Sequence, residues 1–327
     1  MKYSIILPVR NGGHYLKECV NGILAQTFGD FNCIVLDNCS TDGTTEWLQS
    51  LEDPRIVLHR SDKSLTIEEN WSRIKDVPKN EFMTMIGHDD WLQPFYLEEM
   101  NALIGRHPAA GLYQTHFTYI DQDGRFVRNC LPMDEHQCLH EFLSCQMART
   151  IDSTGTGYMM RSADYDRTGG MSPGFPNLIF ADYALWTDLM LKGYKATASR
   201  DCFSYRLHDS LSKTTNGMVY QAAFGKYVAH MKQMMEKDPA THAAVQRYGK
   251  DMLLYYCESL SHRLLKTPPA LRSLRVKDYI RLCEGYAQEL IPGQEFRPME
   301  KIRIRAASRI DDFYISSQLF RLFRRII

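Results

Sequence analysis

The sequence predicts an α/β protein with a mostly parallel sheet flanked by helices, followed by a C-terminal helical extension. Short apolar runs of strand length alternate with amphipathic runs of helix length through the first 125 residues. From Tyr220 onward only long amphipathic helical stretches remain. Because the chain has 327 residues, we expect one domain of catalytic size and an appendage.

The predicted elements follow one another in a regular order. Tyr3–Val9 is an apolar run ended by a turn, which is typical of a buried strand, and apolar residues at helical spacing from Tyr15 to Leu24 predict a helix. Phe31–Asp37 is a second buried strand, and the Ser/Thr/Asp residues that follow it begin the next helix. The same alternation predicts strands at 55–59, 81–86 and 111–120 and helices at 66–75 and 94–106.

The second part of the chain is less regular. Between residues 124 and 174 Gly, Ser and Pro are frequent, as in binding loops. A helix is predicted at 182–192, and residues 195–214 indicate one or two short strands that lead into a polar segment. The helical remainder has breaks at 237–241, 266–270 and 290–298. We therefore place a catalytic domain at 1–216, in halves 1–125 and 126–216, and a helical extension at 217–327.

Composition excludes several classes of protein. Lys and Arg number 39 and Asp and Glu number 39, which argues against a general nucleic-acid binder. The nine cysteines are irregularly spaced, which favours reduced thiols in a cytoplasmic protein over a secreted disulfide framework. The N-terminal apolar run is too short for a signal peptide, and no window approaches the roughly 20 apolar residues of a membrane span. A soluble or peripheral protein is expected.

The GxGxxG, GxxxxGK[ST], HExxH and GxSxG motifs of nucleotide-binding and hydrolytic enzymes are absent at the expected places. The candidate catalytic residues are therefore carboxylates, at two positions in the sequence. Asp89 and Asp90 follow the strand at 81–86, and Asp37 ends the second strand. Both places lie at the carboxyl ends of strands, where ligands bind in such sheets. Asp89 and Asp90 are either caps of the following helix or ligands of a Mg²⁺ or Mn²⁺ ion that also binds a diphosphate. Asp37 is either a turn residue or an acceptor for a nucleobase or ribose.

Two stretches together resemble the inverting family 2 glycosyltransferases of GT-A fold. They are "SIILPVRNGGHYLKECVNGILAQTFGDFNCIVLDNCSTDGTTEWL" and, some fifty residues after Asp37, "MIGHDDWLQP". The resemblance covers residues 3–125 well and continues loosely to about 215. It implies a nucleotide-binding half, an acceptor-binding half, and transfer from a nucleotide-diphospho-sugar to a hydroxyl of a saccharide or lipid-linked saccharide. Bacterial surface polysaccharide or glycolipid synthesis is the expected setting.

The resemblance also implies roles for individual residues. Asp89 is expected at the ribose and Asp90 at the Mn²⁺ or Mg²⁺ ion, although Gly87 stands where many members have the first Asp of a DxD triplet. The residues expected to bind the nucleotide, usually uridine diphosphate, are Pro8, Arg10, Asn11, Asp37, Lys63 and Asn70.

The downstream motifs supply the remaining roles. "NLIFADYALWTDLMLKGYK" places Asp182 where the family has its catalytic base, with Ala181 where Glu is common. "YRLHDSLSKT" places Arg206 at the diphosphate and His208 at the metal or diphosphate. Read without the family, Asp182 fits a helix cap equally well. Two tryptophans are either platforms for an acceptor sugar or core residues, namely Trp91 and Trp186.

The last 27 residues hold seven basic and two acidic side chains. Leu319, Leu322 and Phe323 fall on one helical face, and Arg321 and Arg324 fall elsewhere. Such a helix either lies on an anionic membrane surface or docks on protein, including a second subunit of a homo-oligomer.

Two rival functions stay open. One is a catalytically silent sugar-nucleotide-binding module, because Asp is missing at 87 and Glu at 181. The other is a sugar-phosphate nucleotidyltransferase, because Arg10, Gly12 and Gly13 partly match the loop that such enzymes carry after the first strand.

Overall fold

The computed structural model describes residues 1–208 and 215–312. Within these residues the chain forms two compact units, one of residues 1–142, 150–174 and 181–208 and one of residues 143–149, 175–180 and 215–312. The expected catalytic domain of 1–216 differs from the first unit in two ways. The first unit ends earlier, and two short segments within 143–180 belong to the second unit.

The first unit begins with parallel strands. β1 (Tyr3–Val9) pairs with β2 (Phe31–Asp37) on one side and with β4 (Phe82–Met85) on the other, and β2 pairs with β3 (Ile56–Arg60). These pairings agree with the strands predicted from the sequence. The helices of this part are α1 (Gly13–Leu24), α2 (Thr44–Ser50), α3 (Ile67–Ser72), the short 3₁₀ helix Arg73–Lys75, and α4 (Tyr96–Arg106).

The sheet continues through a strand that the sequence pattern did not reveal. β9 (Tyr158–Arg161) lies antiparallel between β4 and β6 (Leu112–Ile120), and β6 pairs in parallel with β10 (Lys195–Arg206). The order is β3-β2-β1-β4-β9-β6-β10-β5. The short antiparallel strands at its margins are β5 (Trp91–Leu92), β7 (Phe126–Asn129) and β8 (His136–Gln137). The helices in this stretch of the sequence are α5 (Leu139–Ala148), α6 (Ser162–Thr168), the 3₁₀ helix Pro176–Leu178, and α7 (Ala181–Met190). The 3₁₀ helix and the part of α5 from residue 143 onward belong to the second unit.

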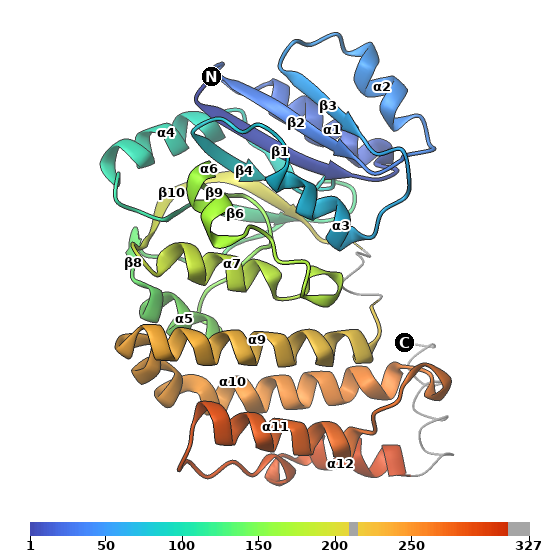
Figure 1. Ribbon diagram of the computed structural model, residues 1–327, viewed down its shortest axis with the longest axis vertical. Helices are drawn as coiled ribbons and strands as arrows, with labels where there is room; N and C mark the ends of the chain where they lie inside the picture. The colour runs from blue at the N-terminus through green and yellow to red at the C-terminus, as the bar shows by residue number, and fades with distance from the viewer. Residues whose placement is uncertain (209–214, 313–327) are drawn as a thin grey trace. The chain divides into compact units, whose positions relative to one another are not determined.

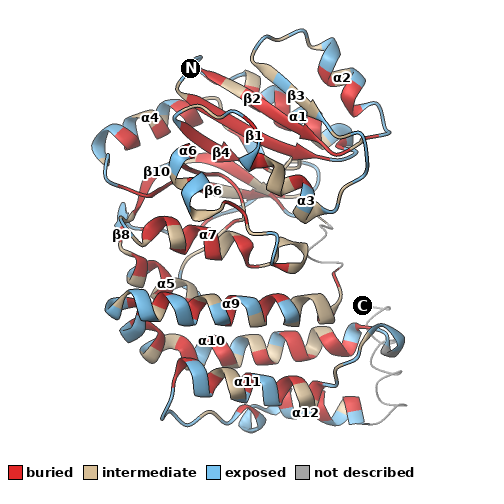
Figure 2. Cartoon of the chain, viewed as in Figure 1, coloured by how far each residue is buried: buried red, intermediate tan, exposed pale blue. Residues whose placement is uncertain are grey.

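The core of the first unit lies on the sheet. Every residue of β1 is buried, as expected of a strand that is covered on both faces. α1 contributes Leu16, Val20 and Ile23 at helical spacing, and each buried side chain of this size stabilises the fold by about 1.5–3 kcal/mol. Figure 2 shows the central strands as almost continuously buried. All nine cysteines lie within the described residues and have free thiols, as expected.

The second unit is helical, as predicted. Figure 1 shows α9 (Gly217–Lys237), α10 (Pro239–Lys266), α11 (Val276–Leu290) and α12 (Ile302–Asp312) side by side. Asn216 accepts hydrogen bonds from the first N–H groups of α9, and Asp238 does the same for α10. The 3₁₀ helices Pro269–Leu271 and Pro298–Glu300 stand at the predicted breaks.

Among the residues that the structure describes, no helix is both long and apolar enough to cross a bilayer. The basic amphipathic helix expected around Arg321, Arg324 and Arg325 lies outside the described residues.

Candidate active site

Two turns at the carboxyl ends of β1 and β2 are hydrogen-bonded to each other. The amide of Asn11 donates to Ser40 Oγ at 2.9 Å, and Asn11 Oδ1 accepts from the amide of Thr41 at 2.8 Å. The amide of Gly13 donates to Asp42 Oδ2 at 3.1 Å. Asn11 has a φ of 51°, a conformation that asparagine tolerates better than most residues. We call residues 10–13 and 37–45 the rim turns, because together they form one edge of the site.

Three of the residues that were expected to bind the nucleotide keep this candidate role. Pro8 is buried near the end of β1 and shapes the entry to the first rim turn. Arg10 is exposed in that turn, and Lys63 is exposed on the connection between β3 and α3. Both cations are accessible to an anionic ligand.

Asp37 does not have the expected free carboxylate. Its side chain is fully buried, and Oδ1 accepts from the amide of Ser40 at 3.2 Å and from its hydroxyl at 2.5 Å. Oδ2 accepts from Thr45 Oγ1 at 2.7 Å and lies 3.6 Å from Arg60 Nε. Because both oxygens have partners in the protein, Asp37 shapes the second rim turn, and the contact with the nucleotide that the sequence predicts for it stays a prediction.

Asn70 is likewise used by the protein itself. Its Nδ2 donates to the carbonyl oxygen of Leu36 at 3.2 Å, and its Oδ1 accepts from Arg73 at 2.9 Å. Arg73 also donates to the carbonyl oxygen of Asp37 at 3.2 Å. Asn70 therefore positions the end of β2, and its predicted contact with the nucleotide stays a prediction.

Asp89 and Asp90 point to different environments, which explains how the fold tolerates adjacent carboxylates. Asp90 is buried, with Oδ1 accepting from the amide of Arg206 at 3.0 Å and Oδ2 from Thr156 Oγ1 at 2.9 Å. Burial, with the neighbouring charge of Asp89, raises the pKa of Asp90 well above its ordinary value. Asp89 is a quarter exposed, and its Oδ2 lies 2.6 Å from His208 Nε2.

The charge state of Asp89 follows from its neighbours. Burial acts to raise the pKa of Asp89, but the hydrogen bond with His208 and the nearby His88 and His208 rings hold it below its ordinary value. The accessible, ionised carboxylate beside an imidazole is thus Asp89. The metal-ligand role predicted for Asp90 fits Asp89 better, because both oxygens of Asp90 face protein donors.

Gly87 explains the departure from a DxD triplet. A Cβ atom at this position would lie 2.5 Å from Asp89 Oδ1 and 3.2 Å from Asp90 Oδ2. Any side chain here would displace the Asp89 carboxylate from its place beside His208. The glycine is therefore part of the geometry that brings Asp89 and His208 together.

Arg206 is a buried positioning residue and does not offer a free guanidinium. Its Nε donates to the carbonyl oxygen of Asp89 at 2.8 Å, and one terminal nitrogen donates to that of Gln122 at 3.1 Å. The other terminal nitrogen donates to Glu18 Oε2 at 2.6 Å, and the guanidinium lies 4.6 Å from the centre of the Tyr15 ring. These donors hold β10, α1 and the Asp89 turn together, and the predicted contact of Arg206 with the diphosphate stays a prediction.

Replacing Arg206 with methionine is expected to lower the free energy of unfolding by about 3 kcal/mol, because carbonyl groups and Glu18 lose their donor. Urea denaturation measures the effect. Arg200→Met on the same strand is the matched control, since Arg200 is half exposed and its ion pair with Glu99 is long, 4.0 Å. We expect less than about 1 kcal/mol there. Equal losses in the two variants would contradict the positioning role.

Asp182 begins α7 beside the same loop that contacts Asp90. Burial raises the pKa of Asp182 from 3.8 to about 6, against the opposing effect of hydrogen bonds from its own amide and that of Tyr183. A Cβ atom at Gly155 would lie 3.4 Å from Asp182 Oδ2, and the next residue, Thr156, donates to Asp90. The segment 155–156 therefore connects the two carboxylates, as expected if they share a site.

The two tryptophans have different surroundings. Trp186 is fully buried, and its ring is tilted by 30° against that of Tyr158 with ring centres 4.4 Å apart, which favours the core role over the acceptor platform. Trp91 is 37% exposed on β5 and lies against α1, where a Cβ atom at Gly22 would come within 2.5 Å of the indole. Trp91 therefore keeps its candidate role.

Three further site residues received no role from the sequence. Thr156 contacts Asp90 and Glu18 contacts Arg206. The two residues of each pair are far apart in sequence, so only the structure identifies Thr156 and Glu18 as site residues. His88 stands next to Asp89 in the GHDD motif, and burial lowers its pKa. Its position in that motif was the sequence signal that could have identified His88 as a site residue. Its lowered pKa places a neutral imidazole at the site.

Comparisons with known proteins identify the family of this chain. The model of glycosyl transferase family 2 matches residues 4–167, slightly more than half of the chain. Glycosyltransferase GlyG of Streptococcus pneumoniae is 30% identical over 126 residues, which are 38% of this chain and 42% of GlyG. This match therefore spans less than half of that relative. The putative teichuronic acid biosynthesis glycosyltransferase TuaG of Bacillus subtilis is 25% identical over 209 residues, which are 62% of this chain and 78% of TuaG.

Solved structures show the same fold. Residues 1–349 of S. aureus TarS, solved in complex with UDP, match with a TM-score of 0.60 and 16% identity over 91% of this chain and 93% of that one. The same TarS fragment solved with UDP-GlcNAc gives a TM-score of 0.59. The structural likeness confirms the GT-A fold expected from the sequence. With the family match over residues 4–167, it follows that the chain belongs to glycosyl transferase family 2.

Proposed function

We propose that the protein is an inverting, metal-dependent glycosyltransferase that moves a sugar from a nucleotide-diphospho-sugar to an acceptor hydroxyl. One observation carries the proposal. Asp182, a carboxyl group whose pKa is raised to about 6, lies at a loop that also contacts the Asp89–Asp90 turn. A base and an anion-binding metal site side by side are what this reaction needs. The structures of TarS with UDP and UDP-GlcNAc support a UDP-sugar as the donor.

The residues at the Asp89 turn fit a divalent cation. Asp89 Oδ2 and His208 Nε2 are hydrogen-bonded to each other at 2.6 Å. With the shared proton released, they would offer a carboxylate oxygen and an imidazole nitrogen, ligand types that suit Mn²⁺ and accommodate Mg²⁺. Bound there, the ion would neutralise charge on the diphosphate leaving group. Exposed Arg10 and Lys63 would add positive charge near the rim turns, where we place the nucleotide.

Asp182 performs the proton transfer in this proposal. Its carboxylate accepts the proton of the acceptor hydroxyl while that oxygen attacks the anomeric carbon from the face opposite the diphosphate. The bond between that carbon and the diphosphate oxygen breaks in the same step, so the configuration inverts. A pKa of about 6 leaves Asp182 ionised at neutral pH and more basic than an ordinary aspartate.

For the acceptor, we propose a saccharide or lipid-linked saccharide of a bacterial surface polymer, which the name of TuaG supports. A cytoplasmic location, with the basic C-terminal segment at the membrane face, remains part of the proposal, as does a homo-oligomer.

Release of the nucleotide tests the proposed reaction. The protein with Mn²⁺ and a series of UDP-, GDP- and dTDP-sugars is expected to release nucleoside diphosphate slowly in the absence of acceptor, because water replaces the hydroxyl. EDTA should abolish the release. Binding of UDP without turnover of any donor would favour the silent module. Release of pyrophosphate from a nucleoside triphosphate and a sugar 1-phosphate would favour the nucleotidyltransferase.

A further inference from the structure

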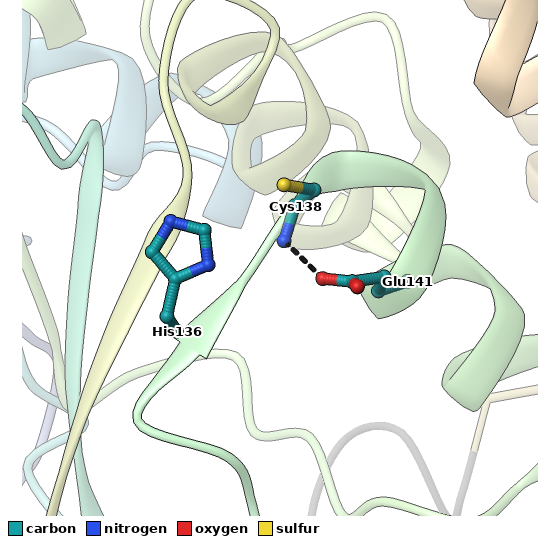
Figure 3. Close-up of side chains that lie close together, drawn as sticks. All are labelled: His136, Cys138 and Glu141. Atoms are coloured by element: carbon teal, nitrogen blue, oxygen red, sulfur yellow. Dashed lines mark hydrogen bonds between the residues drawn. The ribbon is translucent and has the colours of Figure 1, made fainter.

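We propose that His136, Cys138 and Glu141 form a second metal site, suited to Zn²⁺ and separate from the active site. These residues lie where β8 ends and α5 begins, and one potential ligand atom from each lies within 4.8 Å of the others. Figure 3 shows the three side chains grouped at this junction. The proposed transfer reaction assigns no role to any of them.

The backbone holds the three ligands in place without a metal. His136 pairs with Ala196 in the antiparallel contact of β8 with β10, and its ring is tilted by 31° against that of Tyr194 with centres 4.0 Å apart. The amide of Cys138 donates to Glu141 Oε2 at 2.7 Å, which keeps that carboxylate beside the thiol. The site therefore needs movement of side chains only.

The ligand set selects among metals. Imidazole nitrogen, thiolate sulfur and carboxylate oxygen are the three protein ligand types of zinc, whereas Mg²⁺ and Ca²⁺ prefer oxygen alone. In tetrahedral zinc the ligand atoms stand about 3.3–3.8 Å apart, so a contraction of about 1 Å from the longest separation closes the site. The side chains of His136 and Glu141 are exposed, and we expect a change in their side-chain torsions to supply this contraction. Zn²⁺ with one thiolate, one carboxylate and a neutral imidazole has no net charge, and water completes the coordination.

The position of the cluster indicates a structural role. β10 begins at Lys195, which pairs with β8 beside the cluster, and ends at Arg206 in the active site. The whole strand therefore separates the two sites. A metal ion at the cluster would join β8 to the first turn of α5 and stabilise the fold in proportion to its occupancy.

Cobalt substitution tests the site in the full-length protein. After removal of bound metal, Co²⁺ is expected to give a thiolate-to-cobalt charge-transfer band in the near ultraviolet, which Asp89 and His208 cannot produce because neither has a thiol. Zn²⁺ should displace the band. Cys138→Ser should abolish it. Cys145→Ser changes a partly buried cysteine within α5 and should leave the band unchanged.

Equilibrium dialysis with Zn²⁺ gives a second readout. Glu141→Gln is expected to weaken zinc binding at this site by at least about tenfold, and Asp89→Asn is expected to leave it unchanged. Absence of the charge-transfer band, or a band that persists in Cys138→Ser, would overturn the proposal. Neither result bears on the glycosyltransferase function, which is measured separately by nucleotide release.

Discussion

Asp182→Asn is expected to reduce the rate of sugar transfer by about 10²–10⁴-fold while it stabilises the protein at neutral pH. The loss of rate follows from removal of the base, because an amide cannot accept the acceptor proton. Nucleotide binding should persist, since the rim turns are held by their own hydrogen bonds, which this substitution leaves in place. In the unchanged protein kcat/KM should rise with pH through about 6 and then level off, as the carboxyl group ionises.

The gain in stability follows from the same pKa. Burial raises the pKa of Asp182 above its unfolded value of 3.8, so the folded state binds the proton more tightly than the unfolded state does. Stability that is present below about pH 4 is lost as pH rises through about 6. A shift of about two units corresponds to about 3 kcal/mol. Because asparagine does not ionise, the variant does not lose this stability as the pH rises.

Urea denaturation of both proteins at pH 4 and pH 7.5 measures this difference. We expect the variant to be more stable at pH 7.5 and the two proteins to differ little at pH 4. Asp188→Asn, on the same helix and away from its first turn, is the matched control and should keep its activity. An active Asp182→Asn protein would contradict the role of the base, and a stability gap that does not change with pH would contradict the raised pKa.

The second large effect is expected when a ligand of the proposed metal ion is replaced. Asp89→Asn should weaken Mn²⁺-dependent binding of UDP by at least about 100-fold, because loss of a direct ligand exceeds the 10–100-fold that loss of an outer partner causes. Isothermal titration with UDP in the presence of Mn²⁺ measures this affinity, and titration without the ion gives the baseline.

Asp90→Asn is the matched control for that experiment. An asparagine at 90 can accept from the amide of Arg206 through its oxygen and donate to the hydroxyl of Thr156 through its nitrogen. We therefore expect UDP affinity to change by only a few-fold. The reverse order of effects, with Asp90→Asn the damaging change, would restore the metal-ligand role that the sequence predicted for Asp90.

The fold was predictable where hydrophobic pattern and local turn signals agree. β1 and β2 lie at the predicted residues because fully buried strands read as continuous apolar runs bounded by Asn, Gly and Asp. β9 was not predicted, because four residues that follow a glycine-rich stretch are too few to show a hydrophobic period. Its antiparallel place between β4 and β6 depends on partners that are distant in sequence. α5 and α6 were hidden in the same irregular region.

The sequence motifs name the candidate carboxylates, but they do not show the surroundings of the candidate cations and aromatic groups. Asp182, Asp89 and Asp90 stand in motifs, whereas the burial of Arg206 and Trp186 is a property of the tertiary structure. Arg206 finds its acceptors in α1 and in the turn after β6, more than 80 residues away in sequence. The choice between Asp89 and Asp90 likewise depends on Thr156, Arg206 and His208.

A crystal of the protein grown with UDP and Mn²⁺ tests the central claim most directly, because the anomalous signal of manganese locates the ion without interpretation of the protein density. We predict one manganese peak bound by Asp89 and His208 and shared with the diphosphate of UDP, with the uridine at residues 10–13 and 37–45. A peak bound by Asp90 while Asp89 stays on His208, or nucleotide bound away from this turn, would contradict the account.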